Sequence, residues 1–352
     1  MGIKTITSHR PGARERLIAR PRRLRKLPLV FLTLLSLFLP SSAAQQRVFL
    51  VGSGGRMEAS LFAAWTEAFN RQNSTVQIGF VPTSSADGIR RVSLALSDFA
   101  AAEIRLPQEE GESSLVRIPI ALIGVVPIYN LPGKAQLRFS GELLGQIYMR
   151  TVSKWNDPRI AALNPGVSLP DLPITPLDRQ EGSGVKFIFD EFLSKSFSGY
   201  RSKGQHRDST ATSGGNLMVQ SVGLTPGAIG YVAVTPGEHH GVAQGLVRNS
   251  AGRFVHGSQA SIYAACAAKA ETLEKHPEVS LVDAPGAESY PIVGFVWLYL
   301  PTSGANAARA KALRHFVGWA LDEGQKYIGQ GLLPLPEGTV AQARAQLEAF
   351  LP

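Results

Sequence analysis

The chain has 352 residues and a formal net charge of +9, from 36 Lys and Arg residues against 27 Asp and Glu residues. Residues 1–44 hold nine of the basic residues and one acidic residue, which leaves 27 basic and 26 acidic residues in the following 308. This near-neutral remainder argues against a nucleic-acid-binding surface, because a polyanion needs many Lys and Arg side chains on one face. The hydrophobic content of 44% excludes a disordered chain, and 308 residues is a size at which one core usually splits into two domains.

The N-terminal segment has the parts of a secretory signal peptide. Its basic stretch is followed by the uncharged apolar run 27–39 and by the small residues Ser42 and Ala44. The alternative reading is an uncleaved membrane anchor. Thirteen residues are few for a hydrocarbon layer of about 30 Å, which argues against that alternative. We predict cleavage after Ala44 and a periplasmic or extracellular location. No Cys stands directly after the run, so no lipid anchor is expected there.

Strands and helices alternate along the rest of the chain. Apolar, β-branched runs predict strands at 47–51, 76–81, 98–102, 118–129, 174–177, 228–232, 245–248 and 291–300. Apolar residues at helical spacing predict helices at 61–69, 89–96, 139–148, 185–193, 260–273, 307–328 and 342–350. The alternation predicts an α/β fold with mostly parallel sheets. The run 118–129 is long for one strand and could connect two domains.

Several residues of types that often take part in chemistry are expected to have ordinary structural roles. The single Cys266 is expected to be a small buried residue, and the four Trp residues are expected in the core. The adjacent His239 and His240 have no spaced partners for a metal, so a surface loop is expected. No Walker A or H-E-x-x-H pattern is present, and we expect neither a metal nor a cofactor.

Two glycine-rich turns each stand immediately before a helix. They are Gly52-Ser-Gly-Gly-Arg-Met57 and Arg179-Gln-Glu-Gly-Ser-Gly184. Backbone N–H groups at a helix N-terminus favour an anion, and glycine lets the backbone approach it closely. The cluster Thr83-Ser-Ser85 follows the second strand, and ligands in α/β sheets bind at the carboxyl ends of strands. Together these turns predict an anion site.

The chain resembles the periplasmic phosphate-binding proteins of phosphate-specific ABC importers. The resemblance covers essentially all of residues 47–352. It is carried by Gly52-Ser-Gly, Ser84-Ser85, Asp98-Phe99, Gly145-Gln-Ile-Tyr148, Lys154-Trp-Asn-Asp157, Leu163-Asn-Pro-Gly166, Arg179 with Gly182-Ser-Gly184, Gly214-Gly-Asn216 and Pro226-Gly-Ala-Ile-Gly-Tyr-Val232.

The resemblance implies a two-domain, type II periplasmic-binding-protein fold that closes on a dehydrated phosphate. Each lobe would be a mostly parallel sheet flanked by helices, with one lobe formed by residues 45–127 and 232–352 and the other by 128–231. The ligand shell carried over from the family is Arg56, Met57, Ser84, Glu103, Arg179, Ser183, Gly184 and Val185. The implied partner is an ABC permease in the inner membrane, and a monomer is expected.

Four positions depart from the family's ligand shell. Glu103 stands where the family has Asp, Arg56 and Val185 each replace a Thr, and Ala102 replaces a Ser. Val185 and Ala102 each lose a hydroxyl donor, whereas Arg56 adds a charged one if it enters the cleft. Arg56 could equally be a solvated turn residue, or could pair with Glu103 and weaken selectivity.

The leading hypothesis is a non-enzymatic binding protein that captures inorganic phosphate for an ABC importer. One alternative is a paralogue that binds another oxyanion or an organophosphate for sensing or secretion. A second is a phosphatase or phosphoryl-transfer enzyme that uses Ser183 or His239. No base is placed by pattern beside Ser183, and its flanks are not those of a hydrolase nucleophile.

Overall fold

The computed structural model describes residues 47–105, 115–201, 211–212, 214–235, 241–302 and 306–350. The predicted signal peptide lies outside the described residues, as do His239 and His240. Residues 46–352 form one compact unit. None of the helices in the described ranges is long and apolar enough to span a bilayer.

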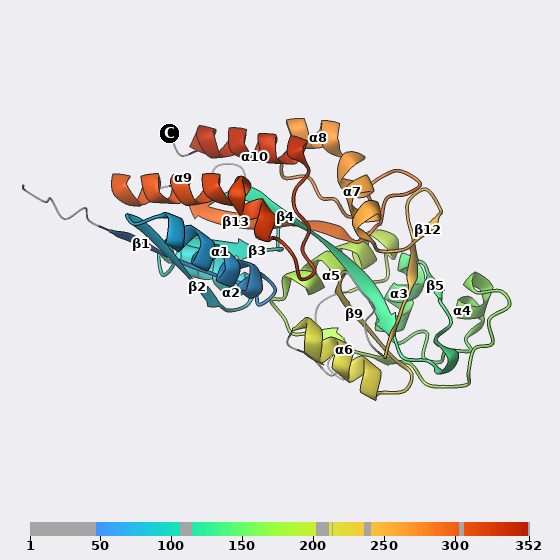
Figure 1. Cartoon of the computed structure of the whole chain (residues 1–352). Helices are drawn as coiled ribbons and strands as arrows, with labels where there is room; N and C mark the ends of the chain where they lie inside the picture. Colours follow the sequence, from blue (N-terminus) through green and yellow to red (C-terminus); the bar gives the residue numbers. More distant parts are fainter. Residues whose placement is uncertain are drawn as a thin grey trace, which may run out of the picture. The chain divides into compact units, whose positions relative to one another are not determined.

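The largest sheet has eight strands within the described residues (Figure 1). They are β1 (Val48–Gly54), β2 (Val76–Pro82), β3 (Phe99–Ala102), β4 (Leu115–Tyr129), β6 (Thr175–Pro176), β9 (Ala228–Ala233), β10 (Ala243–Gln244) and β13 (Val293–Pro301). Their order is β2-β1-β3-β13-β4-β9-β6, and β10 pairs with β4.

The pairing in this sheet is mixed. The strands β1, β2 and β3 are parallel, as are β6 and β9. The central strands β3, β13, β4 and β9 pair antiparallel, as do β4 and β10. The α/β class is therefore confirmed, whereas the expectation of mostly parallel pairing fails in the middle of the sheet. Two strands cause this. The late strand β13 inserts between β3 and β4 and runs against both, and β9 runs against β4.

The remaining strands of the described residues form two smaller sheets. One has the order β12-β11-β5 and the other pairs β7 with β8. Their strands are β5 (Arg138–Phe139), β7 (Asp178–Arg179), β8 (Ala211–Thr212), β11 (Leu246–Arg248) and β12 (Phe254–Val255).

Helices connect and cover the strands. They are α1 (Glu58–Gln72), α2 (Ser85–Ser93), α3 (Gly141–Tyr148), α4 (Pro158–Leu163), α5 (Gly184–Ser196), α6 (Gly215–Leu224), α7 (Gln259–Ala267), α8 (Ala270–Lys275), α9 (Ala307–Leu321) and α10 (Glu337–Phe350), with the 3-10 turns η1 (Pro132–Lys134) and η2 (Glu323–Tyr327). Three serines, Ser84, Ser140 and Ser183, cap α2, α3 and α5 with their hydroxyl oxygens.

Aromatic packing joins α1 to α9. Phe62, Trp65 and Phe69 lie on one face of α1, as their spacing predicts, and contact Phe316 and Trp319 of α9. Such aromatic pairs add about 0.5–1.5 kcal/mol each to the burial of their area. All four Trp residues are buried, and so is Cys266, which confirms both expectations.

Three predicted helices differ in their limits. The helix at 89–96 ends at Ser93, so Leu94 and Leu96 lie beyond it and are more than half exposed. The region 260–273 divides into α7 and α8, and 307–328 divides into α9 and η2, where Asp322 leaves the helical conformation.

The strand β4 is completely buried and changes partner along its length. Residues 115–124 pair with β13, and Val125–Tyr129 pair with β9. At the change, Val125 N–H donates to Ile292 and Gly124 C=O accepts from Val234, both at 2.8 Å. The long run does connect two parts of the sheet, three residues before the predicted lobe boundary at 127. The lobe boundaries themselves stay a prediction.

Candidate functional site

A pocket of about 110 Å³ lies where the turns before α1, α2 and α5 meet. All eight residues of the predicted ligand shell line it. The structure thus brings these residues together, although their contact with a ligand stays a prediction. The pocket walls touch each other, because Ala86 N–H donates to Gly182 C=O at 3.2 Å. Gly182 has a φ of +80°, which glycine adopts without strain, and a Cβ there would also crowd Ser84.

Serine hydroxyls begin two of these helices. The Ser84 oxygen accepts a hydrogen bond from Asp87 N–H at 3.1 Å, and the Ser183 oxygen accepts one from Lys186 N–H at 3.5 Å. A hydroxyl that accepts at its oxygen still has its own hydrogen to donate. Each cap therefore orients one O–H donor at a helix N-terminus, where the helix dipole also favours an anion.

Replacing Ser183 with Ala is expected to reduce both stability and anion affinity. The lost cap should lower the free energy of unfolding by about 0.5–2 kcal/mol, and the lost donor should weaken binding of the predicted anion by roughly threefold to tenfold. Ser140→Ala is the matched control, since Ser140 caps α3 by the same bond at 3.1 Å and does not line the pocket. Urea unfolding and calorimetry of both variants measure the two effects. An equal loss of affinity in S140A would contradict a specific role for Ser183.

Arg179 brings a buried positive charge to the pocket. The residue is 7% exposed, and its Nε and Nη1 atoms are buried with no hydrogen-bond partner among the residues that the structure describes. Burial lowers the pKa of Arg179, and the negative charges of Glu103 and Asp178 oppose that shift. A guanidinium nonetheless stays protonated in proteins. A buried cation without a bonded anion is costly, so this geometry is suited to receive one.

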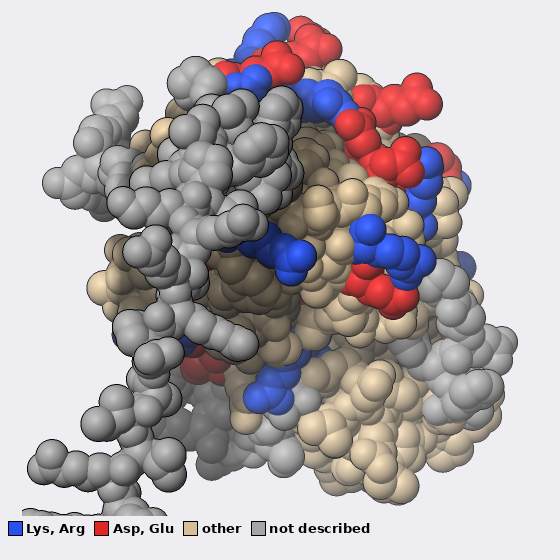
Figure 2. All heavy atoms as spheres, turned by 60° about the vertical axis from the view of Figure 1, so that its left-hand side comes forward, with Lys and Arg blue, Asp and Glu red and all other residues tan. Residues whose placement is uncertain are grey.

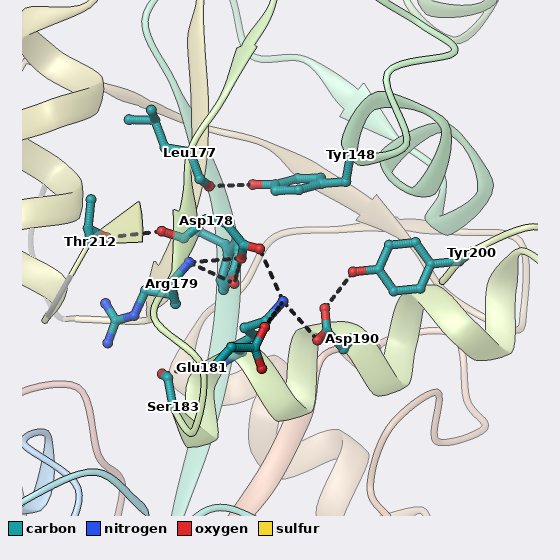
Figure 3. A network of polar contacts seen from close by, with 11 residues as sticks. Tyr148, Leu177, Asp178, Arg179, Glu181, Ser183, Asp190, Tyr200 and Thr212 are labelled. Atoms are coloured by element: carbon teal, nitrogen blue, oxygen red, sulfur yellow. Dashed lines mark hydrogen bonds and ion pairs between the residues drawn. The ribbon is translucent and has the colours of Figure 1, made fainter. Parts of the chain in front are cut away.

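A buried polar network holds the backbone at Arg179 (Figure 3). Asp178 accepts hydrogen bonds from the Arg179 backbone N–H at 2.8 Å and from the Tyr231 hydroxyl. Lys186 lies between Asp178 and Asp190, with ion-pair distances of 3.1 and 3.0 Å. The Arg179 guanidinium points away from this network (Figure 3). The network thus fixes the start of the loop that carries Arg179 and leaves its side chain for the pocket.

Glu103 is the one acidic side chain of the predicted shell, and it is 3% exposed. Ser85 donates a hydrogen bond to its Oε2 at 2.7 Å. The carboxylate also packs against Gly184 at the start of α5, where a Cβ would collide with it. Arg56 is exposed at the pocket rim, and within the described part of the chain it forms no ion pair with Glu103. The predicted alternative of an Arg56–Glu103 pair is therefore not the arrangement found.

Val185 and Ala102 are both buried apolar side chains. The hydroxyl donors that the family has at these two positions are therefore missing here. Thr212 and Gly214 also line the pocket and were not predicted. Gly214 was part of the resemblance, but Thr212 had no signal because β8 is only two residues long. Glu58 and Lys186 were missed as well. Glu58 matters through Glu103, 45 residues away, whereas Lys186 matters because it is buried between Asp178 and Asp190, and the sequence does not show that burial.

The wider surface shows no sign of a polyanion site on the face in view. Lys and Arg side chains lie interspersed with Asp and Glu side chains there (Figure 2). Within the described residues, no group of three or more His, Cys, Asp or Glu side chains is placed to hold a metal ion.

Known proteins share both the sequence and the architecture. Residues 40–323 match the model of the PBP superfamily domain. A phosphate-binding protein PstS from Xylella fastidiosa is 31% identical, over 87% of this chain and 86% of the relative. An ABC-type phosphate transport receptor from Vibrio cholerae is 14% identical with a TM-score of 0.55, and covers 82% of this chain and 100% of its own. The phosphate-bound, high-affinity periplasmic phosphate-binding protein PfluDING is 18% identical with a TM-score of 0.61, over 84% and 93%.

The two solved structures show the fold, and the match to the superfamily model and to the Xylella protein shows the family. The α/β architecture, the strand-end pocket and its glycine- and serine-rich turns agree with that assignment. The chain belongs to the PstS phosphate-binding proteins of the PBP superfamily.

Proposed function

We propose that this protein binds inorganic phosphate in the 110 Å³ pocket and delivers it to an ABC importer. The observation that carries the proposal is the buried guanidinium of Arg179, whose Nε and Nη1 have no hydrogen-bond partner among the described residues and which shares the pocket with two serine-capped helix N-termini. These groups are donors only or have a hydrogen left to donate, and a tetrahedral oxyanion offers acceptors on all sides.

Binding would work by replacing the water around the ion with fixed donors. Arg179 supplies charge, Ser84 and Ser183 supply hydroxyl donors, and the helix N-termini supply backbone N–H groups near Met57 and Gly184. Since these donors are already oriented by caps and by the network behind Arg179, little ordering is needed when the ion enters. Charge-assisted bonds of this kind are about twice as strong as neutral ones.

Glu103 supplies selectivity in this proposal. Phosphate near neutral pH carries a proton that a carboxylate can accept, whereas sulfate carries none. Sulfate would therefore place its oxygen against the Glu103 carboxylate with no hydrogen between them, at a cost of about 1–3 kcal/mol or more. The glutamate keeps the acceptor of the family's aspartate with one more methylene group.

The first experiment is calorimetry of the exported, processed protein with phosphate and with sulfate. We expect phosphate to bind and sulfate to bind at least about tenfold more weakly. Absence of binding for both ions would refute the proposal.

Replacing Glu103 with Gln tests the acceptor role. The amide keeps the size but loses the negative charge, so phosphate affinity should fall about tenfold and the preference over sulfate should narrow. Glu181→Gln is the matched control, because Glu181 lies on the pocket rim with its side chain 83% exposed. Unchanged phosphate affinity in E103Q would show that the carboxylate does not accept a hydrogen bond from the ligand.

A phosphate monoester is a second candidate ligand, favoured by one observation. A cavity of about 350 Å³ adjoins the pocket and shares Arg56, Met57, Arg179 and Gly214 with it. It could hold an organic substituent while the phosphate group occupies the smaller pocket. Calorimetry with glycerol 3-phosphate tests this reading, and weaker binding than that of inorganic phosphate would favour the free ion.

We also propose a periplasmic location and no enzymatic activity. The location rests on the predicted signal peptide and on the family. Ser183 accepts from Lys186 N–H, no His among the described residues lines its pocket, and the Glu103 carboxylate there accepts its hydrogen bond from Ser85, so no Ser–His pair is in place to activate the hydroxyl. A chromogenic phosphate ester should accordingly show no turnover, and turnover lost in S183A would favour the enzyme.

A further inference from the structure

Glu58 is a completely buried carboxyl group that nothing in the proposed binding scheme uses. It is the first residue of α1 and is 0% exposed. As an ionised carboxylate it would have both of its buried oxygens without a hydrogen-bond donor in the described part of the chain. A buried ionised carboxylate with no partner is strongly unfavourable, so the residue demands an explanation.

The carboxyl group lies directly behind the pocket wall. Gly55 lines the pocket, and a Cβ added there would collide with Oε2 of Glu58 and would crowd Oγ of Ser85. The same Ser85 hydroxyl donates to Oε2 of Glu103 at 2.7 Å. Glu58, Ser85 and Glu103 therefore gather around one glycine, with two carboxyl groups sharing a small buried space.

Chemistry restricts how two neighbouring carboxyl groups can coexist in such a space. Two carboxylates are both acceptors and cannot bond to each other, whereas one proton between them makes a hydrogen bond. Like-charged carboxylates in one buried site resist ionising together. Burial raises the pKa of Glu58 well above its usual value, and the charge of Glu103 and a hydrogen bond to Glu103 raise it further. Its place at a helix N-terminus favours the anion, but by a smaller amount.

The other charges near the pair do not remove this constraint. Glu103, the residue that follows β3, is the neighbouring group that acts on Glu58, and Arg179 of β7 acts on Glu103. Arg56 and Glu181 line the same pocket but are exposed at its rim. No ion pair within the described ranges joins Glu58 to a cation, so a single proton is the available means of satisfying it.

We propose that Glu58 is a neutral acid that donates a hydrogen bond to Glu103 and, together with Ser85, positions that carboxylate for the ligand's proton. The pair then carries one negative charge instead of two, beside a pocket that must attract an anion. The ligand-facing part rests on the proposed function, whereas the protonation of Glu58 does not.

Infrared spectroscopy tests the protonation directly, without a ligand. A protonated carboxyl group has a carbonyl stretch that carboxylates lack. The spectrum is taken near pH 8, because burial raises the pKa of Asp190 to about 6 and that group is then ionised. We expect the band in the wild type and its loss in Glu58→Gln.

Glu67→Gln is the matched control for this measurement. Glu67 lies on the same helix, is 75% exposed and pairs with Arg71 on the surface. The E67Q variant should keep the band. A wild type with no protonated-carboxyl band, or a band that persists in E58Q, would overturn the proposal.

A second experiment tests the positioning role with inorganic phosphate as the probe. Gln at position 58 can still donate to Glu103, whereas Leu keeps a similar volume and cannot. We expect E58L to bind phosphate about tenfold more weakly than E58Q. Equal affinities in two folded variants would overturn the positioning role. Failure of the wild type to bind phosphate would instead refute the proposed function and leave the infrared result standing.

Discussion

Replacing Arg179 with Met is expected to lower phosphate affinity by about 100-fold to 1,000-fold, which corresponds to about 3–4 kcal/mol. The same change should stabilise the ligand-free protein by about 1 kcal/mol. The two effects have opposite signs because the guanidinium is buried with Nε and Nη1 unpartnered until an anion arrives. Methionine has a similar length without the charge that must be desolvated.

The opposite signs distinguish a binding residue from a structural one. A residue that supports the fold would lose stability when replaced, whereas Arg179 should gain it. Calorimetry measures the affinity, and urea unfolding without phosphate measures the stability. Arg90→Met is the control, since Arg90 is 68% exposed and pairs with Asp87 on α2. It should change either quantity by no more than about 0.5 kcal/mol. An R179M variant that binds as tightly as the wild type would end the proposal for this pocket.

Replacing Lys186 with Met is expected to destabilise the protein by about 3–5 kcal/mol. Lys186 is 4% exposed and lies between Asp178 and Asp190 at 3.1 and 3.0 Å. Without it, two buried carboxylates are left with no cation between them. Phosphate affinity should fall as well, because Asp178 fixes the backbone of Arg179.

The destabilisation by K186M should depend on pH. Burial raises the pKa of Asp190 to about 6, and the charge of Lys186 opposes that rise. Removing Lys186 therefore raises the Asp190 pKa further, so the folded variant binds a proton more readily than the folded wild type. Below about pH 6 the carboxyl is neutral in both proteins, and the stability difference should narrow.

Urea unfolding across pH measures this difference. Lys195→Met is the control on the same helix, because Lys195 pairs with Glu191 at 3.0 Å and is 42% exposed. Its effect should stay below about 1 kcal/mol at all pH values. A K186M variant as stable as K195M would show that the buried network contributes no stability.

Local signals explain which elements could be predicted from the sequence. The long strands were found because their apolar runs are local, and the buried run 118–129 is the clearest example. The helix α6 was missed because its apolar spacing is weak, with Met218 and Val222 buried but Leu217 and Leu224 exposed. Two-residue strands such as β5 and β8 exist only through their partners and leave no periodicity of their own.

The turns that form the pocket could be predicted from the sequence, but the buried carboxyl pair behind its wall could not. Arg179 and Ser183 stand in a recognisable glycine-rich turn, and the structure places them together with Ser84. Glu58 reads in the sequence as an ordinary acidic residue in the first turn of a helix, where negative charge is common. Its burial beside Glu103 depends on how the start of α1 meets the residue after β3, a contact between residues 45 positions apart that no local pattern encodes.

The change of partner along β4 limits how the molecule can move. Because hydrogen bonds to Ile292 and Val234 hold the strand on both sides of the junction at Gly124 and Val125, the backbone cannot fold sharply there without breaking them. A Cβ at Gly124 would also collide with Ile262, so the side-chain packing leaves little slack. Relative rotation of the two parts of the sheet must therefore twist β4 gradually along its length. This favours a small rotation between the two parts over a large one.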